Sequence, residues 1–116
     1  MRINIEETDL NEDGTHYTHR GELFTGEIVV TDRAGTVVAV KPVVGGRQHG
    51  VERAWYPDGT LRREIPLDNG VVRGTSRRWH PNGRLAEERE FDDAGNWVAV
   101  RRWAEDGTVL ESKRYD

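Results

Sequence analysis

One short stretch, WYPDGTL at residues 55–61, decides the fold because the chain repeats it. WHPNGRL follows at 79–85 and WAEDGTVL at 103–110. The tryptophans that open the three copies are 24 residues apart, and four glycines keep the same spacing: Gly35, Gly59, Gly83 and Gly107. A fixed period of this size is typical of a repeat protein.

A second column of glycines marks where each unit begins. Gly26, Gly50 and Gly74 keep the 24-residue spacing until Val98 interrupts it. The spacing predicts four hairpin repeats, at 26–49, 50–73, 74–97 and 98–116, after an acidic lead-in with one or more capping strands at 1–25. A third of the 116 residues are charged and 34% are hydrophobic. This is a poor supply of apolar residues for a compact two-layer core, whereas a stack of repeats, in which each unit buries one apolar stripe against its neighbours, needs fewer.

Each unit has the pattern of a β-hairpin. In the second unit, two runs with β-branched and aromatic residues, VERAWY and LRREIPL, flank the turn PDGT. Proline, aspartate and a left-handed glycine in this order predict a type I turn closed by a G1 bulge. Gly59, Gly83 and Gly107 are therefore expected to be structural.

The expected turn sets a register. It places Trp55 opposite Leu61, Val51 opposite Ile65 and Trp79 opposite Leu85, and it pairs Arg77 with Glu87 and Arg101 with Glu111. A two-residue turn would separate tryptophan from leucine onto opposite faces. Arg63 would face Arg53, so we expect it to find Glu87 of the next hairpin instead.

Successive hairpins are expected to form an all-β fold, a single twisted antiparallel sheet with Trp55, Trp79 and Trp103 in a structural column. The other face is the expected binding surface. It would carry Glu52, Ala54, Tyr56, Arg62 and Glu64, then Ser76, Arg78, His80, Ala86 and Glu88, then Val100, Arg102, Ala104, Leu110 and Ser112. Tyrosine and arginine often dominate interface energy, so Tyr56, Arg78, His80 and Arg102 are the candidate partner-binding residues. The alternative is a solvated face with mixed charges.

Negative charge is concentrated at the beginning of the chain. The net charge is −4, and residues 1–27 hold seven acids against two bases, a local charge of −5. Such a segment disfavours nucleic acid, and Glu6, Glu7 and Asp9 could steer a partner with a basic surface. The alternative is a solvated polar lead-in.

The sequence contains little that would support catalysis. Cysteine is absent, which excludes thiolate nucleophiles and cysteine zinc sites. His16 and His19 would lie on opposite faces of a strand, and VVGGRQHG lacks the GK[ST] of a phosphate loop. No catalytic residue, metal or cofactor is expected. The chain has no apolar run long enough to cross a bilayer and no signal sequence pattern, so a cytoplasmic protein is expected.

These motifs resemble the MORN-repeat variant family, whose units carry an aromatic pair, an Asn-Gly or Asp-Gly turn, a following leucine and a boundary like NGxxxG. WYPDGTL, WHPNGRL, WAEDGTVL and DNGVVRG (68–74) match this pattern. The first unit departs from it, because DRAGTV lacks both tryptophan and proline, and so does Val98. The resemblance implies a protein-binding module and not an enzyme.

For small bacterial members, the resemblance implies an antitoxin or immunity protein that neutralises a cognate toxin by covering it. The alternative function is a structural scaffold or assembly module, which would self-associate or contact membranes without a toxin partner. Neither nucleic acid nor membrane is an expected partner under the first reading.

Overall fold

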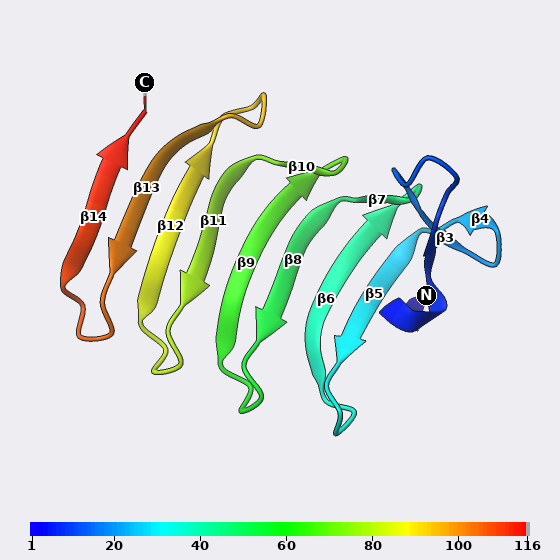
Figure 1. Cartoon of the computed structure of the whole chain (residues 1–116), viewed down its shortest axis with the longest axis horizontal. Helices are drawn as coiled ribbons and strands as arrows, with labels where there is room; N and C mark the ends of the chain where they lie inside the picture. The colour runs from blue at the N-terminus through cyan, green and yellow to red at the C-terminus, as the bar shows by residue number, and fades with distance from the viewer. Residues whose placement is uncertain (116) are drawn as a thin grey trace.

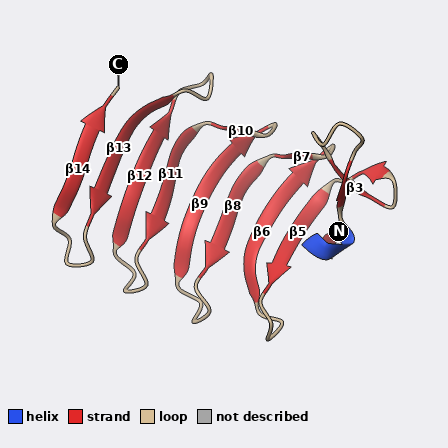
Figure 2. Ribbon diagram, viewed as in Figure 1, coloured by secondary structure: helices blue, strands red, loops and turns tan. Residues whose placement is uncertain are grey.

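The computed structural model describes residues 1–115. Its main element is one long sheet of 11 strands, and the only helical element among the described residues is a single 3-10 turn, η1 (Ile5–Glu7) (Figures 1 and 2). The expected all-β sheet of hairpin repeats is confirmed. No helix among residues 1–115 is long and apolar enough to cross a membrane.

Four hairpins make up the sheet. Their strands are β5 (Gly26–Thr31) with β6 (Val37–Val44), β8 (Gly50–Trp55) with β9 (Leu61–Asp68), β11 (Gly74–Trp79) with β12 (Leu85–Phe91), and β13 (Trp97–Trp103) with β14 (Val109–Arg114). These eight strands pair antiparallel with one another in sequence order. Two short strands, β7 (Arg47–Gln48) and β10 (Val71–Val72), lie in the connections and pair antiparallel with β6 and β9.

The N-terminal segment covers the first edge of the sheet in two ways. β1 (Arg2–Asn4) pairs with β5 in parallel, so the sheet is not antiparallel throughout. A second sheet of three short strands, β2 (Asp9–Leu10), β3 (Tyr17–His19) and β4 (Glu22–Leu23), lies beside it. Residues 2–4 thus form a strand along this edge, and residues 9–23 form a sheet of their own.

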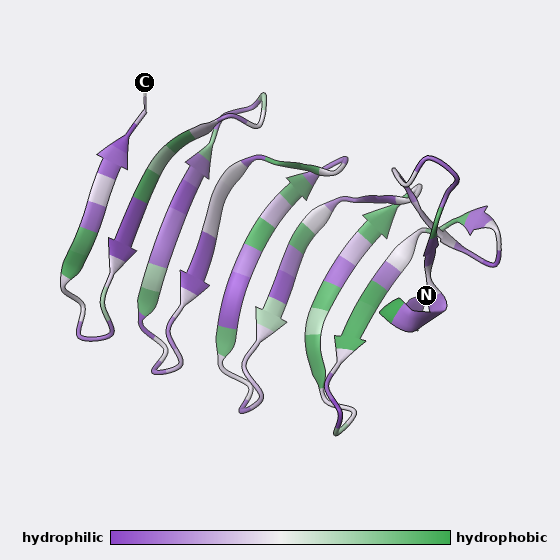
Figure 3. Ribbon diagram, viewed as in Figure 1, coloured by the Kyte–Doolittle hydropathy of each residue, from purple (hydrophilic) through white to green (hydrophobic). Residues whose placement is uncertain are grey.

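The one cluster of buried hydrophobic side chains among the described residues lies at this N-terminal end, although Val100 on β13 is also fully buried. Ile3, Phe24, Ile28 and Val43 form one buried cluster, with Ile5 and Tyr17 packed against it. In Figure 3, β5 and β6 are largely hydrophobic, β11 and β12 are mostly polar, and β13 has one hydrophobic stretch. The rest of the molecule is a plate, with overall extents of 48 × 38 × 19 Å.

The turns have the predicted geometry. In the second hairpin the N–H of Gly59 donates to the Tyr56 carbonyl and the N–H of Tyr56 donates to the Thr60 carbonyl. Gly35, Gly59, Gly83 and Gly107 have φ between 85° and 93°. This is a type I turn with a glycine bulge, and Trp55 lies opposite Leu61 and Trp79 opposite Leu85 as expected.

Beyond that first pair the predicted register is wrong by one residue. A further bulge follows in every hairpin, so that Val51 pairs with Pro66, Arg77 with Glu88, and Arg101 with Ser112. The extra residues of the bulges recur at the 24-residue period: Val38, Arg62, Ala86 and Leu110. A bulge of this kind places two residues opposite one and changes which face the following side chains occupy.

The observed register defines two faces. Because paired residues share a face and alternate along each strand, the face that carries Trp55, Trp79 and Trp103 is here called the Trp face. The other is called the opposite face, and it carries Ala54, Arg63, Arg78, Glu87 and Arg102. Glu64, Glu88 and Ser112, which the sequence placed on the opposite face, lie on the Trp face.

Candidate binding faces

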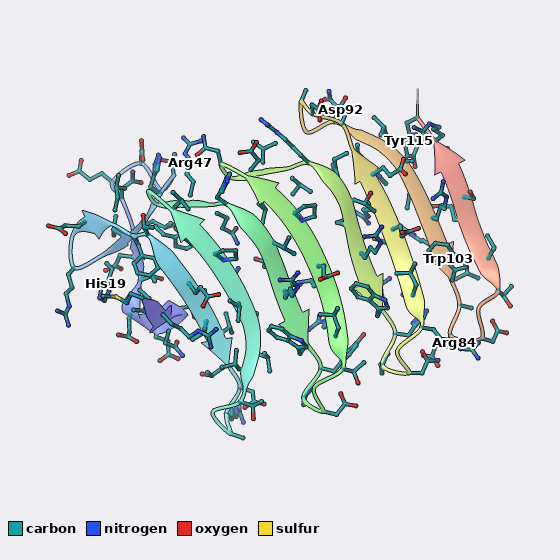
Figure 4. The ribbon with its side chains drawn as sticks, turned by 180° about the vertical axis from the view of Figure 1, so that it is seen from behind. His19, Arg47, Arg84, Asp92, Trp103 and Tyr115 are labelled. Carbon is teal, nitrogen blue, oxygen red and sulfur yellow. The ribbon has the colours of Figure 1, made fainter. Side chains whose placement is uncertain are left out.

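The tryptophan column is present, but it is not a buried core. Trp55, Trp79 and Trp103 are each half-buried, and Arg53, Arg77 and Arg101 on the same face are exposed. The N-terminal segment packs against the buried cluster on β5 and β6, and within residues 1–115 no second layer lies over the strands toward the C-terminus (Figure 1). The side chains on both faces of these strands are therefore available to a partner (Figure 4).

Arginine and glutamate doublets place ion pairs on both faces. On the Trp face, Arg77 Nε lies 2.8 Å from Glu88 Oε2 and Arg101 Nη1 lies 3.7 Å from Glu88 Oε1. On the opposite face, Arg78 and Arg102 contact the neighbouring Glu87. Adjacent residues of a strand point to opposite faces. An Arg-Arg doublet on one strand and a Glu-Glu doublet on its neighbour therefore give each face its own row of Arg–Glu ion pairs.

Two candidate binding residues, Arg78 and Arg102, lie on the opposite face with about half of each side chain exposed. Arg63 also lies there, opposite Ala54 in one neighbour and Arg78 in the other. Its ion partner is Glu52, at 3.7 Å, and not Glu87 as the predicted register implied. Glu52 is almost fully buried and also contacts Lys41 at 3.2 Å.

The other two candidates, Tyr56 and His80, link neighbouring hairpins. The Tyr56 hydroxyl donates to the Trp79 carbonyl over 2.7 Å. His80 Nε2 lies 2.8 Å from the Trp103 carbonyl oxygen, the same contact one unit later. Both side chains are half-buried. These contacts give them a structural role, and their role in binding a partner stays a prediction.

The acidic candidates lie at the N-terminal end of the plate. Glu7 Oε1 accepts the N–H of Asn4 in a capping box, and Glu6 and Asp9 are exposed. The structure thus separates the acidic candidates from Arg78 and Arg102, which lie on strands toward the other end (Figure 1).

Sequence reasoning missed an aromatic group at the C-terminal end of the opposite face. The rings of Trp97 and Tyr115 are 5.1 Å apart, with Arg89 Cζ 5.0 Å above Trp97 and Lys113 Nζ 5.3 Å from Tyr115. Trp97 is 42% exposed and Tyr115 is 41% exposed. A signal did exist, because Trp97 is the one tryptophan that stands outside the 24-residue column.

The hollows of the surface are shallow and open. One of them, of about 490 Å³, lies between the N-terminal strands and the connections after β6 and β9, with Leu10, Tyr17, Arg47 and Val71 in its lining. His16 there accepts a hydrogen bond from Arg47 Nε, whereas His19 contacts the Glu7 carbonyl. Within the described part of the chain, no group of three or more His, Cys, Asp or Glu residues could hold a metal ion.

The shifted pKa values belong to the turns. The N–H of Thr60 donates to Asp58 and, with the Thr60 hydroxyl, lowers the pKa of that carboxyl below 3.8. Hydrogen bonds from Asn96 and Thr108 lower the pKa values of the Asp92 and Asp106 carboxyls in the same way. These carboxylates are acceptors that hold turns together and not candidates for acid–base chemistry.

Comparison with known proteins supports a repeat module. The sequence model of the MORN repeat variant family matches residues 48–69 and 73–93, which are most of the second and third hairpins. Proteins with MORN repeats generally use them to bind other proteins or membranes. No curated protein and no solved structure matches the chain.

Proposed function

We propose that this protein is a binding module for another protein, and specifically an antitoxin or immunity protein that neutralises a cognate toxin by covering it. The observation that carries the binding role is the bare plate, whose two faces both present ordered Arg–Glu ladders to solvent. A rigid surface of this kind keeps the ordering cost of association low. The toxin partner rests on the resemblance to small bacterial MORN-like proteins.

The test of this proposal begins with the product of the neighbouring gene. The two proteins should copurify at equal stoichiometry without added nucleotide or metal, and expression of this chain should protect cells from that product. A partner that neither copurifies nor becomes less toxic contradicts the immunity function.

The acidic N-terminal end should affect the rate of association. Replacing Glu6, Glu7 and Asp9 with lysine should slow binding to a basic surface on the partner and weaken its dependence on salt, because exposed remote charges act mainly on the encounter. Stopped-flow association at two salt concentrations measures this. Equal rates for the two proteins would show that the segment is only a solvated lead-in.

The second candidate function is a scaffold. β14 ends the sheet with all six residues exposed, including Val109 and Leu110, and an exposed edge is a template for pairing with another chain. Concentration-dependent light scattering together with no toxin binding favours this function.

A further inference from the structure

The opposite face carries more positive charge than its own carboxylates neutralise. From β6 to β14, leaving the bulged Arg62 aside, its cations are Lys41, Arg63, Arg78, Arg89, Arg102 and Lys113. Its carboxylates are Glu52, Glu87 and Glu111, so six charges against three leave +3. On the Trp face of the same strands, five arginines (47, 53, 77, 101 and 114) meet four carboxylates (64, 68, 88 and 90) and leave +1.

The excess is centred on Glu87. This single carboxylate contacts Arg89 at 2.7 Å, Arg102 at 3.0 Å and Arg78 at 3.8 Å. Three guanidinium groups carry fifteen N–H donors between them, because each has five. The two oxygens of Glu87, together with Glu111 at 3.9 Å from Arg102, cannot accept that many, so most of the donors have no carboxylate acceptor within this face.

The hydrogen-bond geometry agrees with this shortage. The Nε atoms of Arg63, Arg89 and Arg102 are covered and make no hydrogen bond to the described residues. Arg89 Nε and Arg102 Nε lie 2.7 and 3.0 Å from Glu87 oxygens without a hydrogen-bonding angle. Arg63 Nε lies 3.7 Å from Glu52, beyond hydrogen-bond distance. The exposed guanidinium ends are suited to donate bidentate hydrogen bonds to the oxygens of additional carboxylates.

Apolar and aromatic surface lies next to these arginines. A hollow of about 180 Å³ runs past Arg63, Ile65 and Arg78 between β9 and β11. These two strands share only two residue pairs, whereas the strands of each hairpin share at least five. Trp97 and Tyr115 stand at the far side of the same face, where Tyr115 lies near the end of the strands away from Trp103 and the turns (Figure 4).

We infer that the opposite face from β9 to β14 docks an acidic segment of a protein partner, with carboxylates on Arg63, Arg78, Arg89 and Arg102 and an apolar side chain on Trp97 and Tyr115. Arginine, tryptophan and tyrosine are the residues that carry most binding energy at protein interfaces. A long polyanion such as nucleic acid fits less well, because the chain is −4 overall and −5 over residues 1–27. The inference rests on the proposed function, since it names the chemistry of the partner, which must then present an acidic region here and a basic one near the N-terminal end.

The experiment compares the two faces within the same strands. The probe is a fluorescein-labelled peptide of glutamates with two phenylalanines, measured by anisotropy against a lysine peptide of equal length, an oligothymidine and vesicles with anionic lipid. The double variant Arg78→Ala/Arg102→Ala should weaken binding of the acidic peptide at least tenfold. The control Arg77→Ala/Arg101→Ala removes the same residue types one position earlier, on the Trp face, and should change binding less than twofold.

A second measurement uses the unmodified protein, so it does not depend on how the variants fold. In NMR titrations with the acidic peptide, the Nε–Hε signals of Arg63, Arg89 and Arg102 should shift, and those of Arg53, Arg77 and Arg101 should not. Equal effects of the two double variants, equal shifts on both faces, or tighter binding of the oligothymidine or the vesicles than of the peptide would overturn the inference. If a toxin copurifies but the acidic peptide does not bind, the inference is overturned and the proposed function stands. If the peptide binds but no toxin partner is found, the inference stands and the proposed function is contradicted.

Discussion

At the scale of single residues, a substitution at a turn glycine should strain the backbone without causing a steric clash. Gly83 has φ of 87°, and a side chain there would meet nothing within 4 Å. We therefore expect Gly83→Val to destabilise the protein by about 1–3 kcal/mol through backbone strain alone. Urea titration measures the loss, and a variant as stable as the parent contradicts the bulged turn.

Gly45 provides the control for that experiment. Its φ of 57° lies in the left-handed region that asparagine adopts, and the space around it is also open. Gly45→Asn should stay within about 0.5 kcal/mol of the parent, as expected of a surface substitution.

Asp58 should make the second turn sensitive to acid. Its pKa lies below 3.8 in the folded protein because the N–H and the hydroxyl of Thr60 donate to it. A carboxyl with a lowered folded pKa stabilises the protein above its unfolded pKa and loses that contribution as the pH falls through the folded value. The stabilisation is therefore complete at pH 7 and declines below about pH 4.

The third unit offers a natural replacement, because Asn82 accepts the N–H of Arg84 at the matching position. Asp58→Asn should keep the turn and remove this part of the acid sensitivity, so its stability deficit relative to the parent should shrink between pH 7 and pH 3. Asn82→Asp should add the same sensitivity to the third turn. A deficit that is constant with pH would assign the acid dependence to other carboxyls.

At the scale of the elements, the turn of one hairpin is hydrogen-bonded to the last residue of the first strand of the next hairpin. Tyr56→Phe removes the bond to the Trp79 carbonyl and should cost about 0.5–1.5 kcal/mol, the usual net contribution of one hydrogen bond. The Tyr115 hydroxyl makes no hydrogen bond to the described residues, so Tyr115→Phe should leave the unfolding midpoint nearly unchanged. Equal losses would show that the contact between hairpins is not stabilising.

Because the tryptophans are only half-buried, replacing one of them should reduce the stability less than replacing a fully buried aromatic residue. Removing a large buried aromatic side chain costs about 3–5 kcal/mol, but Trp79 is only half-buried. We expect Trp79→Ala to cost roughly 2 kcal/mol and Arg77→Ala, which is exposed, well under 1 kcal/mol. Calorimetry of both variants measures the ratio, and equal losses would mean that the column does not stabilise the stack.

The hairpins, their turns and the Trp–Leu pairs were predictable from the sequence because the 24-residue period and the turn residues mark them directly. The second bulge was not predictable, because no single residue type marks it: Val38, Ala86 and Leu110 are aliphatic and Arg62 is basic. Charge pairing could not reveal it either. Arg77-Arg78 lies across from Glu87-Glu88, so either register matches arginine with glutamate. The excess charge of one face appears only when the register is known.

At the scale of the whole molecule, packing is uneven from end to end. Ile28 is fully buried in the N-terminal cluster, whereas Val109 on the last strand is 61% exposed. Ile28→Ala should cost about 2–5 kcal/mol, and Val109→Ala should change stability by less than about 0.5 kcal/mol. In native-state hydrogen exchange, amides of β5 and β6 should be the last to exchange and those of β14 the first. Uniform protection would mean that the plate opens only as one unit.

The regular placement of the bulges limits how this protein can change its length. Each unit has its turn glycine and its bulged residue at the same two places, so an in-frame tandem duplication of 74–97 would continue the sheet with every later side chain on its own face. Deletion of a single strand residue would instead exchange the two faces for everything that follows. Insertions and deletions are therefore tolerated only as whole units. Each added unit would lengthen the series of charged side chains on both faces by the same amount.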